Sequence, residues 1–387
     1  MESALTGIRI VEQGTFITGP CAGMLLADLG ADVIKIESPD GDPYRSYQGS
    51  QYSAHFQAYN RNKRSMALNM KLASERELFA SLIREADVYI QNFRPGAAER
   101  IGAGVEQLLS INPRLVYCSI SGFGATGPYA ERPSYDSVAQ ALSGFLSVVV
   151  DYRRPQFLGP ALADAITGMY ASQGVLAALV RRGRTGTGGH VEISMLEAMT
   201  HFAIEPFAAF FALGTTPTSA DRPRLAQAYI LRTADDRLIA IHLSSLEKFW
   251  TGLVAALESP ELGTDPRFNP RERRIAEYDT LRVELDARFS RQPLAHWLQR
   301  LGAADVPHAP VNRLDEVVND PQVRHLGIVV PIESPHTATE AVRPAVRFDG
   351  RRAHSVRPAP LLDEHGKTIR ASLKEATAWP IRSGATS

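Results

Sequence analysis

The sequence predicts an α/β protein with a large, doubly wound, Rossmann-like domain and a smaller α+β domain. Short runs rich in β-branched residues alternate with helical patterns from residue 7 to about residue 120. A stretch rich in Pro, Ser and Thr at residues 215–224 then reads as a linker, and a second set of elements follows it. With 387 residues, the chain is long enough for two or three domains.

The first domain is predicted from its alternating elements. Parallel strands need crossover connections, and the segments between the apolar runs have helical periodicity. In such a sheet, ligands bind beyond the carboxyl ends of the strands. Strands are expected at residues 8–11, 32–36, 65–68, 87–91 and 115–119, and helices at residues 22–29, 74–86 and 105–111.

The elements that follow complete this domain and begin the next. A long apolar helical pattern opens near Asp164 and runs through Val180, and a glycine-rich turn at residues 184–189 follows it. A strand at residues 190–193 and one helix over residues 195–209 come next. Beyond the linker, we expect a strand at residues 238–242 and helices at residues 247–257, 278–289 and 293–301.

Composition narrows the possible partners. Lys and Arg together number 42, as do Asp and Glu, so no net field favours nucleic acid or a membrane surface. A small molecule or a second copy of the chain is the expected partner. The two cysteines lack metal-ligand or redox spacing, which predicts no metal site and no disulfide. No uncharged run approaches the ~18–20 residues that span a bilayer, so we expect a cytoplasmic protein.

One motif suggests a dinucleotide site but lacks its context. Residues 122–127 read Gly-Phe-Gly-Ala-Thr-Gly and follow an expected strand. A Rossmann loop must open a helix whose N-terminus holds the pyrophosphate, yet Pro128 and Pro133 follow here. The sequence therefore argues against nicotinamide binding. It also lacks the phosphate-loop, zinc-protease and serine-elbow signatures.

Asp164 is the candidate nucleophile. The first turn of a helix has unpaired N–H groups and the positive end of the dipole, so we expect this carboxylate to be held ionised and oriented. An ionised, partly desolvated carboxylate can attack a carbonyl. Taken by itself, an aspartate at a helix start is more often structural. The sequence segments before and after Asp164 decide whether it is a structural residue or a nucleophile.

Ordered blocks along nearly the whole chain resemble the family III CoA-transferases, which include formyl-CoA transferase and α-methylacyl-CoA racemase. Several blocks in one order are more specific than any single motif. Besides the Asp164 segment, the resemblance rests on residues 5–45, 60–71, 91–102, 112–129, 133–144, 185–199, 265–268 and 305–312.

The resemblance implies an activity and an organisation. It makes Asp164 the nucleophile that moves CoA from an acyl-CoA, with a succinyl-CoA-like donor favoured, to a carboxylic acid. The intermediates would be aspartyl anhydrides and an aspartyl-CoA thioester, with CoA as a substrate and no permanent cofactor. The family fold implies a large CoA-binding domain at residues 1–215, a small domain at 225–325, and a segment at 326–387 that returns to the large domain. An interlinked homodimer is expected.

The resemblance also assigns residues to the CoA site. Pyrophosphate and ribose phosphate need cationic or polar partners, and adenine needs an apolar or planar surface. Arg45, Lys63 and Arg94 are weaker candidates that we expect to be solvated surface charges. Asp136 is expected to line the site, together with the assigned CoA-binding residues Phe16, Ile17, Thr18, Leu72, Asn92, Phe93, Arg100, Tyr135 and Met195.

Three departures from the family pattern bear on specificity. Tyr135 stands where the racemases have a histidine, and a phenol ionises near pH ~10, which disfavours proton shuttling at neutral pH. Residues 224–229 lack the glycine run of the formyl-CoA transferases, so oxalate is not supported as acceptor. Ser38 replaces a basic residue and puts one CoA contact in doubt. An acyl-CoA racemase or isomerase and a CoA-binding module without turnover are the alternatives.

Overall fold

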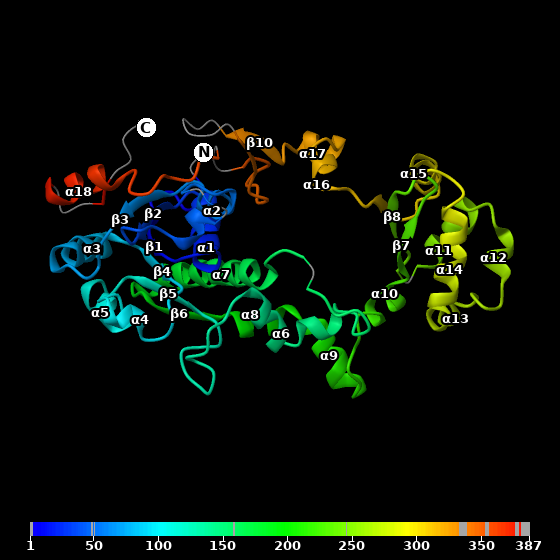
Figure 1. Ribbon diagram of the computed structural model, residues 1–387, viewed down its shortest axis with the longest axis horizontal. Coiled ribbons are helices and arrows are strands. Elements are labelled where there is room, and N and C mark those ends of the chain that lie inside the picture. The colour runs from blue at the N-terminus through cyan, green and yellow to red at the C-terminus, as the bar shows by residue number, and fades with distance from the viewer. Residues whose placement is uncertain are drawn as a thin grey trace. The chain divides into compact units, whose positions relative to one another are not determined.

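The computed structural model describes residues 3–47, 49, 51–157, 159–244, 246–332, 339–352, 356–375 and 379–380. The chain forms two compact units (Figure 1). Unit 1 contains Met1–Leu146, Phe157–Ile204 and Arg324–Ser387, and unit 2 contains Ser147–Gln156 and Glu205–Val323.

Unit 1 is built on a six-stranded sheet with the strand order β3-β2-β1-β4-β5-β6. All five pairings are parallel, which confirms the predicted parallel α/β sheet. The strand order reverses between β1 and β4, which is where such sheets bind ligands. The strands are β1 (Arg9–Gln13), β2 (Asp32–Glu37), β3 (Arg64–Ala67), β4 (Val88–Gln91), β5 (Val116–Ser121) and β6 (Gly189–Ser194).

Helices cover both faces of this sheet, so the residues of its central strands β1 and β4 are almost all buried. On one face α1 (Thr18–Asp28) and α7 (Leu162–Thr185) share a core with the sheet. On the other face lie α3 (Ala73–Glu85), α5 (Val105–Ile111) and, from the far end of the chain, α18 (Gly366–Glu375). A Cβ on Gly168 of α7 would lie 2.7 Å from Cys21 Cβ, so α1 and α7 pack closely there because of this glycine.

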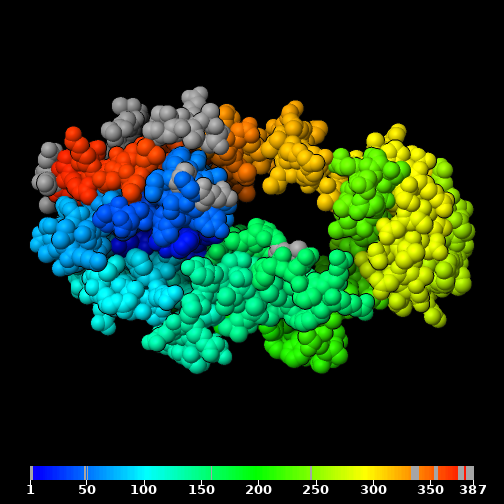
Figure 2. All heavy atoms as spheres, viewed as in Figure 1, coloured from blue at the N-terminus to red at the C-terminus, as the bar shows by residue number. Residues whose placement is uncertain are grey.

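The C-terminal segment covers the edge strand β3 (Figure 1, Figure 2). The Ala67 N–H donates to Asp363 Oδ1 over 2.8 Å, and the Asp363 N–H donates to Ser65 Oγ over 3.1 Å. Arg370 donates to the Ala67 carbonyl, and the buried Ile369 joins the core below. An edge that would otherwise expose backbone groups is thereby paired.

The single helix predicted over residues 195–209 is wrong. Two helices, α8 (Met195–Phe202) and α9 (Ile204–Leu213), meet at an angle of 64°. Pro206 explains the break, because it has no N–H and its ring collides with the carbonyl four residues earlier. In the described chain no single helix is long and apolar enough to cross a membrane, and only this bent pair qualifies by length and composition.

Shorter elements connect the main ones in unit 1. A β-hairpin of β10 (Val329–Ile332) and β11 (Thr339–Val342) precedes the C-terminal segment. Two further elements, η2 (Phe145–Val148) and α17 (Pro321–Leu326), each lie partly in unit 1 and partly in unit 2. The other elements of unit 1 are η1 (Pro43–Ser46), α2 (Ala54–Asn60), α4 (Ala97–Arg100) and α6 (Asp136–Leu142).

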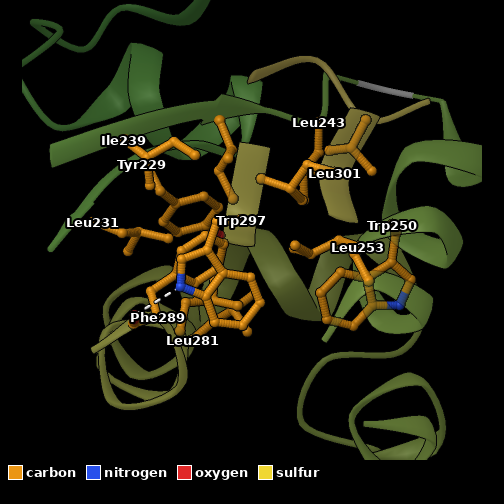
Figure 3. Packing of buried hydrophobic residues seen from close by; sticks show 14 of the residues in the cluster. Tyr229, Leu231, Ile239, Leu243, Trp250, Leu253, Leu281, Phe289, Trp297 and Leu301 are labelled. Carbon is orange, nitrogen blue, oxygen red and sulfur yellow. Dashed lines mark hydrogen bonds between the residues drawn. The ribbon is translucent and has the colours of Figure 1, made fainter. Parts of the chain in front are cut away.

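Unit 2 packs helices on an antiparallel sheet of β7 (Ala228–Arg232), β8 (Leu238–His242) and β9 (His308–Pro310). Its core centres on Trp297, which stacks on Phe289 with ring centroids 4.4 Å apart and donates to its carbonyl (Figure 3). The predicted linker ends in a helix, since residues 221–226 form α10. The helices are α10 (Asp221–Ala226), α11 (Glu247–Ala256), α12 (Pro260–Thr264), α13 (Arg271–Ala276), α14 (Tyr278–Phe289), α15 (Leu294–Ala303) and α16 (Leu314–Val317).

Candidate active site

A cavity of about 660 Å³ opens beyond the carboxyl ends of β1, β4 and β5 in unit 1. Loops that follow these strands form its walls, and the first turn of α7 brings Asp164 into it. The structure gathers most of the sequence-predicted residues here, and these are Phe16, Ile17, Thr18, Asn92, Phe93, Tyr135, Asp164 and Met195.

Asn92 ties the loop after β4 to the loop after β1. Its Oδ1 accepts from the Thr15 N–H at 2.9 Å, and its Nδ2 donates to the Thr15 carbonyl and to Thr18 Oγ1, both at 2.8 Å. Phe16, between these anchors, has a left-handed backbone with φ of 58°. That conformation is costly for a bulky residue and persists only where its surroundings hold it. The Phe16 ring meets Tyr135 edge-on, with centroids 6.0 Å apart.

The structure corrects the expected ionisation of Asp164. Burial, and then the negative charge of Asp136, raise the pKa of the Asp164 carboxyl from 3.8 to about 7. The N–H groups expected to stabilise Asp164 are occupied, because Asp136 Oδ1 accepts from Ala163 N at 2.7 Å and from Asp164 N at 3.3 Å. The helix start therefore stabilises Asp136 and leaves the Asp164 carboxyl partly protonated at neutral pH.

A second cavity of about 770 Å³ lies beyond β1, β2 and β3. Thr15 and Phe93 line both cavities, so the two are neighbours. Ser38 lies in its wall. Leu72 and Arg100 line neither cavity: Leu72 is a half-exposed residue at the start of α3, and Arg100 is an exposed residue at the end of α4. Their chain neighbours Lys71 and Ile101 do line the second cavity.

Two of the weaker candidates are buried, which contradicts the expectation of solvated charges. Arg45 is 1% exposed and its guanidinium grips Glu37, with Nε 2.6 Å from one carboxylate oxygen and Nη2 2.7 Å from the other. Lys63 is 4% exposed and donates to Glu12 Oε2 at 2.9 Å. Both find carboxylate partners on neighbouring strands, which a local charge pattern cannot reveal. Arg94 is exposed and lines the first cavity.

Tyr44, Tyr47 and Arg132 are among the residues of the first cavity that the sequence did not single out. Tyr44 lies in the short helix η1 and Tyr47 directly follows it, beyond the end of β2. Arg132 belongs to the loop after β5, where its guanidinium stands 3.9 Å above the Tyr129 ring. The glycine motif at residues 122–127 begins this loop, and no helix follows it until α6 starts at Asp136, as its prolines predict.

A family model described as CoA-transferase family III matches residues 5–366. The chain belongs to CoA-transferase family III. The resemblance noted from its sequence blocks is thereby confirmed, and the protein is an enzyme that transfers CoA.

Other members of family III match over nearly their whole length. An acetyl-CoA:oxalate CoA-transferase from Acetobacter aceti is 35% identical over 379 residues, which are 94% of this chain and 94% of that protein. A succinate–glutarate CoA-transferase from Agrobacterium fabrum is 34% identical over 397 residues, which cover 97% and 98% of the two chains. The crystal structure of a CaiB/BaiF family protein from Brucella suis superimposes with a TM-score of 0.86 at 34% identity, covering 96% of this chain and all of that one.

Proposed function

We propose that the enzyme moves CoA from an acyl-CoA thioester to a carboxylic acid, with Asp164 as the nucleophile. The position of Asp164 carries the proposal: it is a partly buried carboxylate inside a cavity at the point where the strand order reverses. A thioester carbonyl has little resonance stabilisation, so a carboxylate held against it can attack.

The proposed reaction has four exchanges. An Asp164 oxygen attacks the donor carbonyl, the C–S bond breaks, and a mixed anhydride and CoA thiolate form. The thiolate attacks the Asp164 carbonyl of the anhydride, which releases the donor acid and leaves a thioester on Asp164. The acceptor carboxylate attacks this thioester to give a second anhydride and thiolate. The thiolate then attacks the acceptor carbonyl, forming the new acyl-CoA and restoring Asp164.

We place the two ends of CoA in the two neighbouring cavities. The second cavity, of about 770 Å³, would take the nucleotide, and the first would take the thioester next to Asp164. Phe93 and Thr15, which line both, mark the passage for the pantetheine arm. Leu72 and Arg100 stay proposed contacts for the nucleotide at the outer edge, since their chain neighbours line that cavity.

Anionic substrates suit the first cavity. Arg94 and Arg132 line it, and neither has a carboxylate partner within 4.0 Å among the residues that the structure describes. Relatives are named for succinyl-CoA, glutarate and mesaconate, which are all dicarboxylic in their acid parts. We propose a succinyl-CoA-like donor on this basis. The Acetobacter aceti relative is named for oxalate, whereas residues 224–229 here lack a glycine run, and we propose that oxalate is a poor acceptor.

We further propose a cytoplasmic homodimer. None of the α9 residues is buried, and Phe211 and Leu213 are 76% and 72% exposed. Apolar side chains grouped in this way on a surface mark an interaction site. A molar mass of one chain by light scattering at micromolar concentration would refute the dimer.

Asp164→Asn tests the mechanism, because the amide keeps the shape of the carboxyl and removes the nucleophile. We expect transfer from succinyl-CoA to a panel of carboxylic acids, read by mass spectrometry of new thioesters, to fall at least ~10³-fold. CoA affinity by calorimetry should change little. Hydroxylamine added with acyl-CoA should convert the wild-type Asp164 to a hydroxamate found by peptide mapping.

The exposed Asp236, in unit 2, serves as the matched control as Asp236→Asn. This variant should turn over normally. An Asp164→Asn enzyme with near-normal turnover would eliminate the proposed nucleophile.

A further inference from the structure

Six charged side chains are buried together below the loop that follows β1. Each is 5% exposed or less, and they comprise three carboxylates and three cations. Ion pairs join Lys35 to both Glu12 and Asp42, and Lys63 to Glu12. The pair of Arg45 with Glu37 is linked to them by a hydrogen bond from the Asp42 N–H to Glu37 Oε2 at 3.1 Å. We call this set the buried charge cluster, and its members are Glu12, Lys35, Glu37, Asp42, Arg45 and Lys63.

The cluster holds the backbone of residues 14–16. Glu12 Oε1 accepts from the Gly14 N–H at 2.6 Å, and Lys35 Nζ donates to the Gly14 carbonyl at 2.7 Å. Asp42 Oδ1 accepts from the Phe16 N–H at 3.1 Å. These bonds fix the backbone that leads into Phe16, whose φ is 58°. They satisfy backbone groups that a turn between a strand and a helix leaves without regular partners.

The same cluster also reaches the elements on either side of this loop. Lys63 Nζ donates to the Pro20 carbonyl in the first turn of α1, at 2.8 Å. Asp42 Oδ1 accepts a second hydrogen bond, from the Tyr44 N–H at 2.9 Å. Tyr44 lines the Asp164 cavity and its ring meets that of Phe16 at a centroid distance of 5.8 Å. The Asp42 carboxylate therefore positions two residues that line the cavity, Phe16 and Tyr44.

Stability alone does not explain such a cluster. Burying an ion costs several kcal/mol of hydration, and well-packed apolar side chains are often at least as stable as a buried pair. Burial acts to raise the pKa of Glu12, but the Lys35 and Lys63 charges lower it, so this carboxylate stays ionised. Charges kept at this cost, three of which bond directly to one loop, indicate that the position of the loop matters.

We propose that Asp42 and Lys35 are positioning residues for CoA transfer, which hold the strained Phe16 loop and Tyr44 at the distance from Asp164 that the reaction needs. The inference rests on the proposed function, since the geometry being held is that of the proposed thioester site. A displacement of about 1 Å in such a site can cost ~10²-fold in rate. Neither residue lines the cavity that holds Asp164, so both act on that cavity through the loop, while Asp42 also lies in the wall of the second cavity.

Asp42→Ala and Asp42→Asn test the proposal against Asp28→Ala. Asp28 is the matched control, because it is 3% exposed and forms a bidentate pair with Arg61, and its side-chain bonds among the described residues go to Arg61 and Asn62 rather than to the Phe16 loop. Each alanine variant removes one carboxylate partner from a cation, Lys35 or Arg61, and should lower the melting temperature. Turnover is measured well below those temperatures and divided by the folded fraction from circular dichroism.

We expect Asp42→Ala to lose at least ~10-fold in kcat, Asp42→Asn to regain most of it through its remaining acceptor oxygen, and Asp28→Ala to stay within ~2-fold of the wild type. Full turnover in Asp42→Ala, or an equal loss in Asp28→Ala, would overturn the proposal.

Amide hydrogen exchange in the wild type gives a second test that needs no variant. The Phe16 N–H should be protected, because it donates to a buried carboxylate. Exchange at the rate of an open loop would overturn the proposal even if Asp42→Ala did not fold. This measurement also separates the two proposals: a wild type that transfers CoA to no acid refutes the function, while the Phe16 exchange still reports on the loop.

Discussion

Removing the proposed nucleophile should stabilise the folded protein at neutral pH. The pKa of Asp164 is about 7 in the folded state against an ordinary value of 3.8, so the folded state holds this proton more tightly than the unfolded chain does. Ionising Asp164 therefore costs folding free energy, and the cost grows as pH rises from about 4 to about 7 and is constant above that. Asp164→Asn escapes this cost, because the amide does not ionise.

The size of the effect follows from the same two values. Each pKa unit is worth about 1.4 kcal/mol, so the full difference is at most about 4 kcal/mol. Partial exposure of Asp164 to solvent screens its charge and reduces the value, and we expect a gain of about 2 kcal/mol at pH 8. At pH 4 the gain should fall below about 1 kcal/mol, because wild-type Asp164 is then protonated in the fold and about 40% protonated in the unfolded chain.

Thermal and urea unfolding of the two proteins at pH 4, 6 and 8 measures the effect. Fluorescence and circular dichroism should be followed together, since two units need not unfold in one transition. The stability of Asp164→Asn relative to the wild type should increase with pH and level off near pH 7. A gap that is independent of pH, or one that favours the wild type at pH 8, would refute the argument that burial and Asp136 hold the carboxyl proton.

Three further predictions follow from named contacts. The rate of CoA release from acyl-CoA in the first half-reaction should rise with pH, with its midpoint near pH 7, and level off above that pH. Asp136→Asn, which keeps an acceptor for the Asp164 N–H, should move this midpoint about one pH unit lower; an unmoved midpoint would show that the Asp136 charge does not set the ionisation. Gly168→Ala should destabilise the protein by about 1–3 kcal/mol, because the added Cβ would lie 2.7 Å from Cys21 Cβ. The control is Gly183→Ala in the same helix, whose Cβ would meet no atom within 4 Å and which should raise the melting temperature. Equal effects at the two sites would contradict the close packing of α1 on α7. A 2-methylacyl-CoA incubated with the enzyme in heavy water should gain no α-deuterium during CoA transfer, as mass spectrometry would show, and rapid incorporation would favour the racemase alternative.

Elements with strong local periodicity could be predicted from the sequence. The helices α5 and α14 and the strand β8 begin and end where their residue patterns place them. The strand β7 was missed, because its alternation is concealed: Tyr229 and Leu231 are buried, but the residue between them, Ile230, is apolar and 62% exposed. An apolar side chain on the solvent face removes the alternation that identifies a strand.

The site was predictable only where a residue acts in its own segment. Asp164 stands out at the start of a helix, but the partner that controls its proton, Asp136, lies 28 residues earlier in the chain. Likewise, Lys63 belongs to a basic run that resembles a solvated loop. Its ion-pair partner in the protein interior, Glu12, lies on β1, which is far from Lys63 in the sequence. Long-range pairs of this kind leave no periodic trace in the sequence.

The covering of β3 by the C-terminal segment has a consequence for synthesis of the chain. Ser65 and Ala67 leave the ribosome about 300 residues before Asp363, the residue that pairs with them. Until then the β3 edge has no cover, so unit 1 cannot close while its last part is still being translated, whereas all of unit 2 has been made. The nascent chain thus carries an open strand edge for most of its synthesis, and this is the interval in which a chaperone would protect it from pairing with another chain.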